Sequence, residues 1–286
     1  MSKVEPTLCA PDAEKSCVAC CPPIRPAGYE HVQHKGIVKR MLRENTMAFS
    51  KKGEGIWPIT GFSCWALGYL DQRYRVVGCL LHPFQNNGKD LRYRVDYGGK
   101  CERECCPEAG VFLELGINDR KFWLHLADGL DSFAYSSKKI NPLFRMMGWG
   151  AELLHLITLN SDGRSFIGES FSQAYPFFST RSHPRGNAYI LNTLVRMDSV
   201  NLLKAESFRL QFEAFSTSLS KQLREGRSAH RSQAPHTHLA GLDPYFLDFL
   251  RLSVGITRID REEALRLKEI ADRAIERFHR SFISRS

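Results

Sequence analysis

The spacing of hydrophobic residues changes after residue 106. Beyond that point, apolar side chains recur every three or four positions, which is the spacing of amphipathic helices. This pattern predicts helices over residues 119–135, 142–159, 166–175, 187–224, 243–254 and 260–282. The last two carry helix start signals, because Asp243 precedes a proline and Asp260 stands three residues before Glu263. We therefore expect a helical region over residues 111–286.

The predicted helix over residues 187–224 carries a stripe of large apolar side chains. Its members lie three or four positions apart and so share one helix face: Phe208, Phe212, Phe215, Leu219 and Leu223. A stripe of this kind is typical of packing against other helices rather than of a cofactor site. It predicts a core that includes this helix.

Residues 1–110 show a different pattern. Apolar spacing predicts one helix over residues 29–49. Residues 75–81 are β-prone, residues 91–97 alternate between apolar and polar side chains, and the Asn87-Gly88 pair between them suits a tight turn. The predicted hairpin places Cys79 on its first arm and Cys101 just beyond its second, at one end of a small sheet. The expected fold is mainly α with a small β-hairpin, in which this cysteine-rich region packs on a helical body.

Length and composition are those of a globular protein. The chain has 286 residues, of which 43% are hydrophobic and 25% are charged, enough for one large domain or two ordinary ones. Residues 225–240 contain few large apolar side chains, so we expect a mobile loop there. We interpret His236 and His238, which lie in this segment, as solvated side chains rather than metal ligands.

The formal net charge of +9 favours acidic partners such as nucleic acid, although the excess is spread along the whole chain. On the predicted hairpin, a nucleic-acid-binding surface would use Arg92, Tyr93, Arg94 and Tyr97. No apolar run reaches the length of a signal peptide or a membrane helix. We expect a cytoplasmic protein without a membrane partner, and the sequence indicates no particular protein partner.

All nine cysteines lie between residues 9 and 106, and the helical region contains none. In the reducing cytoplasm, clustered cysteines indicate metal or redox chemistry more often than disulfides. Cys17 and Cys20 have the two-residue gap that lets one turn present two ligands to one ion, and so do Cys79 and His82. The predicted metal ligands are Cys9, Cys17, Cys20, Cys21, Cys64, Cys79, His82, Cys101, Cys105 and Cys106. Zinc and a [4Fe–4S] cluster both suit these ligands, and the sequence leaves open whether there is one site or two.

The cysteine pattern also carries a resemblance to a known family. The motif Cys17-x2-Cys20-Cys21, followed by Gly78-Cys79-Leu80-Leu81-His82-Pro83 and a later Cys101, resembles the bacterial zinc- or iron-chelating, cysteine-rich domain family known as YkgJ-like. The resemblance covers residues 9–106 only and implies metal chelation. The sequence departs from the family pattern in two places, because its opening has three close cysteines rather than four and its last cysteine group ends in an additional pair.

No motif identifies a conventional enzyme. A glycine-rich phosphate-binding loop, His-Glu-x2-His and Gly-x-Ser-x-Gly are all absent from the sequence. The favoured hypothesis is a cytoplasmic metal- or iron–sulfur-binding protein whose cellular role the sequence does not assign. Two alternatives stay open: an iron–sulfur redox or group-transfer enzyme with a substrate pocket in the helical region, and a zinc-stabilised nucleic-acid-binding protein.

Overall fold

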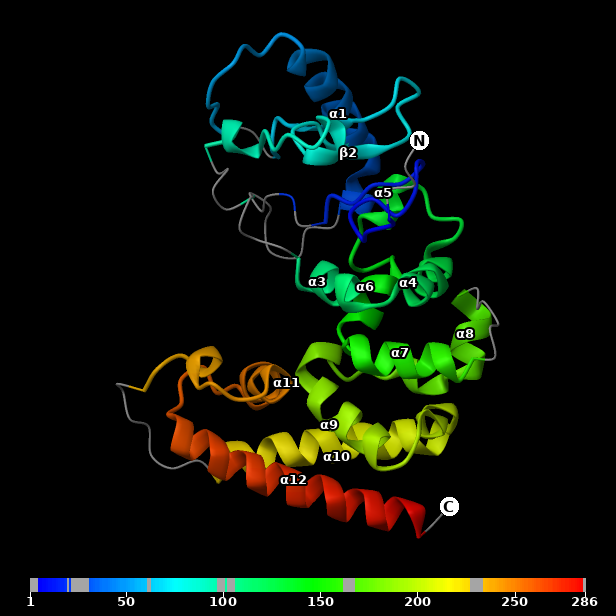
Figure 1. Cartoon of the computed structure of the whole chain (residues 1–286), viewed down its shortest axis with the longest axis vertical. Coiled ribbons are helices and arrows are strands. Elements are labelled where there is room, and N and C mark those ends of the chain that lie inside the picture. Colours follow the sequence, from blue (N-terminus) through cyan, green and yellow to red (C-terminus); the bar gives the residue numbers. More distant parts are fainter. Residues whose placement is uncertain are drawn as a thin grey trace. The chain divides into compact units, whose positions relative to one another are not determined.

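The computed structural model is mainly helical, with a small antiparallel sheet (Figure 1). It describes residues 5–19, 21, 31–60, 63–96, 101, 106–161, 168–226 and 234–284. The chain divides into two compact units, here called unit 1 (residues 1–147) and unit 2 (residues 148–286). The fold class predicted from the sequence is therefore confirmed. The domain boundary predicted near residue 110 stays a prediction, and the helices between residues 107 and 147 are assigned to unit 1.

Unit 1 is built around helix α1 (Lys35–Phe49) and a sheet of two three-residue strands, β1 (Leu67–Tyr69) and β2 (Val77–Cys79). The strands are antiparallel, with Leu67 opposite Cys79. Helix α1, which confirms the helix predicted over residues 29–49, packs on β1 through its polar side chains as well as its apolar ones. Asn45 donates to the Leu67 carbonyl oxygen (2.9 Å), and the Thr46 hydroxyl accepts from the Tyr69 amide (2.8 Å). This approach requires a glycine at position 68, because a Cβ there would lie 2.6 Å from the Thr46 hydroxyl oxygen.

The position of the predicted hairpin is wrong. Residues 75–81 contribute β2, but their partner is the preceding segment 67–69 rather than residues 91–97. The Asp71 carboxylate accepts the amides of Arg75 (2.8 Å) and Val76 (2.7 Å), and this closes the turn between the two strands.

Residues 91–96 do not form the predicted second arm, and Tyr97 lies outside the described residues. The segment Arg92–Arg94 is instead a 3-10 turn, whose first arginine pairs with Asp90. Asn87 and Gly88 do take positive φ angles (53° and 84°), but they follow the short turn Pro83–Gln85 and do not join two strands. A local polar contact therefore outweighs the alternating pattern of this segment.

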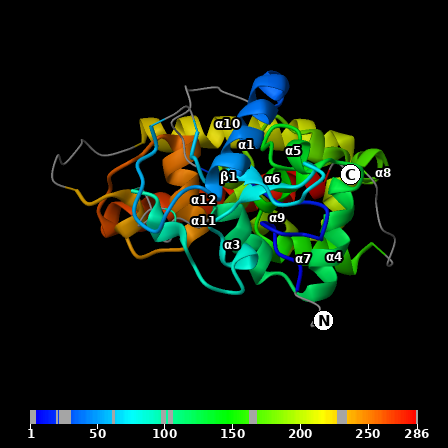
Figure 2. The same ribbon diagram turned by 90° about the horizontal axis from the view of Figure 1, so that it is seen from above.

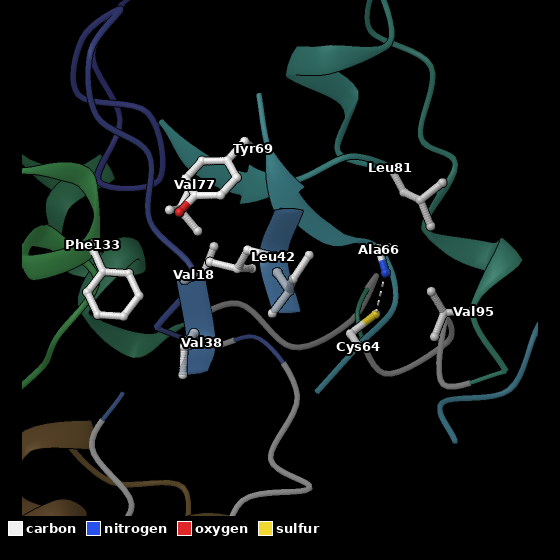
Figure 3. Close-up of a cluster of buried hydrophobic side chains, with 11 residues drawn as sticks. Val18, Val38, Leu42, Cys64, Ala66, Tyr69, Val77, Leu81, Val95 and Phe133 are labelled. Atoms are coloured by element: carbon white, nitrogen blue, oxygen red, sulfur yellow. Dashed lines mark hydrogen bonds between the residues drawn. The ribbon is translucent and has the colours of Figure 1, made fainter. Parts of the chain in front are cut away.

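A hydrophobic cluster joins α1, the sheet and the segments around them (Figure 3). Leu42 lies near its middle, and Leu42 and Ala66 are almost fully buried. The cluster also includes one predicted metal ligand, Cys64, which is 5% exposed. Its buried members are Val18, Val38, Leu42, Cys64, Ala66, Leu67, Tyr69, Val77, Leu81, Val95 and Phe133.

The rest of unit 1 is made of short helices: α3 (Pro107–Glu114), α4 (Ile117–Leu124), α5 (Ser132–Tyr135) and α6 (Pro142–Met147). The single helix predicted over residues 119–135 is interrupted, because Gly129 has a φ of 79°. The chain then restarts at α5, where the Asp131 carboxylate accepts the Ala134 amide (2.7 Å) as a helix cap.

Unit 2 contains the two longest helices among the described residues, α10 (Glu206–Glu225) and α12 (Arg261–Ile283). Its other helices are α7 (Ala151–Leu159), α8 (Gly168–Ala174), α9 (Pro184–Met197) and α11 (Pro244–Asp248), and a π-helical turn over Phe249–Val254 follows α11. Helices α10 and α12 lie side by side (Figures 1 and 2), and the rings of Phe215 and Phe278 stack between them with centroids 4.3 Å apart. Both predicted caps are confirmed: Asp243 accepts the Tyr245 amide (2.7 Å) and Asp260 accepts the Glu263 amide (2.8 Å).

Two of the long helices predicted after residue 106 are each divided in two. Residues 142–159 are split at Gly150, whose φ is 96° and which faces the ring of Tyr245 so closely that a Cβ would clash with it. Residues 187–224 form α9 and α10, with a 3-10 turn over Val200–Lys204 between them. Periodicity alone predicts the helical content of these stretches but misses such breaks.

The apolar stripe on α10 lies in the core of unit 2, as predicted. Phe208, Phe212, Leu219 and Leu223 are at most 1% exposed. Phe212 contacts the rings of Phe177 and Trp149 with centroid distances of 5.0 and 6.4 Å. Contacts of this kind between aromatic edges and faces stabilise the core beyond the area that they bury.

The loop predicted over residues 225–240 is only partly as expected. Residues 227–233 lie outside the described residues. The following segment is packed rather than exposed, because Thr237 is fully buried and donates to the Ile256 carbonyl oxygen (2.7 Å). The neighbouring His236 and His238 side chains stack on each other with centroids 5.7 Å apart. The buried hydroxyl of Thr237 anchors this segment. The polar composition of the segment gave no sign of this contact.

Candidate metal centre

Three cysteines of unit 1 that are distant in the sequence lie within electrostatic range of one another. Cys64 precedes β1, Cys79 ends β2, and Cys101 follows 22 positions later in the numbering. Burial raises the pKa of the Cys64 thiol to about 12, and the nearby Cys79 and Cys101 sulfurs raise it in the same direction by charge repulsion. We call Cys64, Cys79 and Cys101 the first thiol group.

The backbone around Cys64 forms a turn that donates hydrogen bonds to its sulfur. The Ala66 amide donates to the Cys64 Sγ atom (3.4 Å), while the Cys64 carbonyl oxygen accepts the Leu67 amide (3.1 Å). Figure 3 shows the first of these bonds among the buried apolar side chains. Amide hydrogen bonds to sulfur stabilise a thiolate, which is the form that a metal binds.

A permanent positive charge lies beside the first thiol group. Arg92 pairs with Asp90 (2.6 Å) and donates through Nη1 to the Cys101 carbonyl oxygen (2.8 Å). The hydrogen bond to Asp90 raises the pKa of Arg92, and the negative charges of Cys79 and Cys101 raise it further. The guanidinium would therefore offset part of the negative charge of thiolates held there.

His82 lies near the same arginine. Burial lowers its pKa, and the positive charge of Arg92 lowers it further, so the imidazole is neutral at physiological pH. Its Nδ1 atom accepts the Phe84 amide (3.3 Å), and the two rings lie 4.7 Å apart. A neutral imidazole can bind a metal through the ring nitrogen that carries no proton. In His82 that nitrogen is Nδ1, which already accepts the Phe84 amide.

A second set of predicted ligands lies around α5 and α3. The Cys17 amide donates to the Cys9 carbonyl oxygen (2.9 Å), so the two residues lie on neighbouring segments. Cys106 precedes α3, and its sulfur donates to the Glu108 carboxylate (2.6 Å). We call Cys9, Cys17 and Cys106 the second thiol group.

The remaining predicted ligands are placed differently. Cys21 packs partly buried against the hydrophobic cluster of unit 1. Cys20 and Cys105 lie outside the described residues. Within the described part of the chain, no three His, Cys, Asp or Glu side chains converge closely enough to hold one ion. The donor chemistry therefore fits a thiophilic metal, whereas the described side chains by themselves do not complete a coordination sphere.

Sequence reasoning missed the residues that fix the cysteine loop. Ser132 on α5 accepts the amides of Ser16 (3.2 Å) and Val77 (3.0 Å) and is 1% exposed. Ser136 accepts the Val18 amide (3.1 Å), so two hydroxyls bracket Cys17. Only the spacing of four positions between these serines, which places them on one helix face, hinted at this role.

The arginines of the nucleic-acid hypothesis are placed differently from the expectation. Arg92 is bound to Asp90 and to the Cys101 carbonyl oxygen, and Arg94 donates to the Lys52 carbonyl oxygen (3.4 Å). Tyr93 is 50% exposed, and Tyr97 lies outside the described residues. Both arginines are thus used in contacts within the chain, although nucleic-acid binding itself stays a prediction.

The protein is thus a mainly helical chain whose cysteines all lie in unit 1. The chain matches no protein-family model, no curated protein and no solved structure. Among the described residues, no helix is long and apolar enough to cross a membrane.

Proposed function

We propose that unit 1 binds a metal ion or an iron–sulfur cluster through the first thiol group, in a cytoplasmic protein. One observation supports this proposal: Arg92, which donates to the Cys101 carbonyl oxygen, lies within electrostatic range of the Cys79 and Cys101 sulfurs, and these lie within range of Cys64. A cation next to a thiol favours its thiolate form, which is the form that binds a metal. The resemblance to zinc- or iron-chelating domains points in the same direction.

The chemistry of the group favours a soft metal. Thiolates select zinc and iron–sulfur clusters over magnesium or calcium. When bound, zinc would supply a structural crosslink, and a cluster would supply electron transfer or sensing. The chain's own contribution is to bury Cys64, to donate the Ala66 amide to its sulfur and to balance the charge of Cys79 and Cys101 with Arg92.

Anaerobic purification of the untagged protein tests the proposal. Iron, zinc and acid-labile sulfide are measured together with the ultraviolet–visible spectrum. We expect stoichiometric zinc, or iron with sulfide and a broad visible absorbance. Cys64→Ser and Cys79→Ser should each lower the metal content severalfold, because each removes a ligand whose replacement cannot supply a thiolate.

A matched control is Ser220→Ala in unit 2, which removes a buried hydroxyl that donates to the carbonyl oxygen of Ser216 on its own helix (2.8 Å). This variant should keep the wild-type metal content. A wild-type protein that contains neither iron nor zinc, and takes up neither on reconstitution, would refute the proposed function.

A further inference from the structure

The turn that follows α1 holds a lysine between two tryptophans. The Lys52 ammonium nitrogen lies 4.5 Å from the ring centroid of Trp57 and 4.8 Å from that of Trp65. Attraction between a cation and the face of an aromatic ring holds the ammonium group in place without neutralising its charge. Among the residues that the structure describes, no carboxylate pairs with this group. Its N–H donors are therefore fixed in position and can bind an anion from outside the chain.

Hydrogen bonds to the backbone fix both indole rings. Trp57 donates through Nε1 to the Gly53 carbonyl oxygen (3.3 Å), and Trp65 donates through Nε1 to the Trp57 carbonyl oxygen (3.1 Å). The Trp65 ring also stacks on the ring of Phe49, with centroids 6.1 Å apart. Because the rings are held in this way, little conformational freedom is lost when a planar group stacks on them.

The same turn presents apolar side chains to solvent. Trp57 is 38% exposed, and the preceding Ile56 is 67% exposed. The Trp57 amide donates to the Arg94 carbonyl oxygen (2.8 Å), which brings the segment of Tyr93, itself 50% exposed, next to this turn. Single exposed apolar residues scattered over a surface need no explanation, whereas neighbouring ones mark interaction sites.

The charges around the turn favour an anionic partner. Residues 35–57, which comprise α1 and this turn, contain six lysines and arginines but two glutamates. Lys35 and Arg40 pair with carboxylates of the chain. The cations that remain are Lys39, Arg43, Lys51 and Lys52. They outnumber the exposed carboxylates of Glu54 and Asp96, and the whole chain has a formal net charge of +9. A polyanion is therefore attracted to this part of unit 1.

We propose that the turn formed by Lys52, Trp57 and Trp65 binds single-stranded nucleic acid. A base stacks on the exposed side of Trp57, while the Lys52 ammonium group, held by both rings, binds a phosphate oxygen. Stacking on an indole requires an unpaired base, because the bases of a duplex already stack on one another. The site differs from the surface that the sequence indicated, which used Arg92 and Arg94. It shares no residue with either thiol group, so this inference does not rest on the proposed function.

Fluorescence anisotropy of labelled oligonucleotides tests the site on the full-length protein as purified. The probes are a deoxythymidine oligomer of about 15 nucleotides, a uridine oligomer and a DNA duplex of the same length. We expect at least one of the single strands to bind more tightly than the duplex, with an affinity that falls as the salt concentration rises. The ratio of the two single-strand affinities distinguishes DNA from RNA as the partner.

Variants of the turn separate stacking from charge. Trp57→Ala should weaken single-strand binding about 5- to 150-fold, because it removes one stacking ring, and Trp57→Phe should restore most of the affinity. Lys52→Gln should reduce the slope of log affinity against log salt concentration by about 0.7, the value of one phosphate contact. Lys221→Gln is the charge-matched control in unit 2, where the Lys221 side chain is 74% exposed, and should leave this slope unchanged.

Several results would overturn the inference. They are absence of single-strand binding at low salt, and a duplex that binds as tightly as the single strands. An unchanged affinity in Trp57→Ala, together with a Lys52→Gln slope equal to that of Lys221→Gln, also overturns it and shows that net charge alone attracts the strand. Circular dichroism checks that each variant is folded. If Trp57→Ala is not folded, Lys52→Gln, which leaves both rings in place, decides the test through its slope.

Discussion

The two units reach stability by different means. Unit 2 contains no cysteine, and its helices bury a continuous aromatic core in which Trp149, Phe177, Phe208 and Phe212 are at most 1% exposed. Unit 1 has a sheet of two three-residue strands and several short helices, joined by side-chain hydrogen bonds to backbone groups. The described core of unit 2 is thus rich in aromatic rings, whereas unit 1 combines its hydrophobic cluster with polar contacts that also shape its cysteine loops.

The largest effect should come from the aromatic core of unit 2. Phe212→Ala removes a ring that contacts Trp149, Phe177 and Phe208, and should lower the free energy of unfolding of unit 2 by about 3–5 kcal/mol. Hydrogen exchange resolved by peptide measures this for each unit separately. Leu210→Ala on the same helix is the control, because Leu210 is 55% exposed and its truncation should cost less than about 0.5 kcal/mol. Equal losses in the two variants would contradict the assignment of the core.

A smaller effect should follow from the polar contacts of unit 1. Ser132→Ala leaves the buried amides of Ser16 and Val77 without their acceptor, and should destabilise unit 1 by about 1–3 kcal/mol. Denaturant unfolding of the metal-free protein, followed by circular dichroism, measures this loss. Ser220→Ala provides the matched change in unit 2 and should cost less than about 1 kcal/mol, because its hydroxyl only adds a bond within its own helix. If the two serines cost the same, the contrast between the units is wrong.

The smallest effect concerns ion pairs and depends on pH. The hydrogen bond from Arg92 lowers the pKa of Asp90, so this pair stabilises the folded chain above the ordinary aspartate pKa of about 3.9 and loses its effect as the pH falls through the lowered value. Asp90→Asn should lower the free energy of unfolding by less than about 1 kcal/mol at pH 7, and the difference from wild type should shrink as the pH falls below 4. Denaturant unfolding at several pH values measures this difference.

Glu152→Gln is the counterpart in unit 2. Arg196 lowers the pKa of Glu152 through a hydrogen bond, but both side chains are more exposed than those of Asp90 and Arg92. Solvent screening should therefore make its effect smaller than that of Asp90→Asn. A larger loss in the Gln variant would reverse the comparison between the two pairs.

Much of the helical architecture follows from the sequence, because long amphipathic repeats and acidic caps are local signals. The stripe on α10 and the caps at Asp243 and Asp260 are where the pattern predicts them. The breaks at Gly129 and Gly150 were missed, since one glycine at a positive φ hardly changes the periodicity of its neighbours. The position of the predicted hairpin was wrong for a related reason. The carboxylates of Asp71 and Asp90 stabilise turns that the alternation of apolar and polar residues does not predict.

The thiol site is only partly predictable. Every cysteine lies between residues 9 and 106, and this confinement predicts a thiol site in that part of the chain. The grouping of Cys64 with Cys79 and Cys101, and the position of Arg92 beside them, depend on the pairing of β1 with β2 and on a 3-10 turn. Contacts between segments so far apart have no signature in spacing, so the sequence placed Arg92 on the predicted hairpin as part of a candidate nucleic-acid-binding surface instead.

Trp149 gives unit 2 a built-in optical reporter. It is the one tryptophan after residue 147, it is fully buried among the rings of Phe177, Phe178 and Phe212, and its indole nitrogen has no hydrogen-bond acceptor in the described part of the chain. An indole in such a dry environment emits at short wavelength. Trp57 of unit 1, in contrast, is 38% exposed and lies under the Lys52 ammonium group (4.5 Å to the ring centroid), where water and charge shift and quench the emission. Trp123 of unit 1 is also fully buried and emits in the same range, so a Trp123→Phe variant leaves Trp149 as the fully buried indole whose emission follows the opening of unit 2.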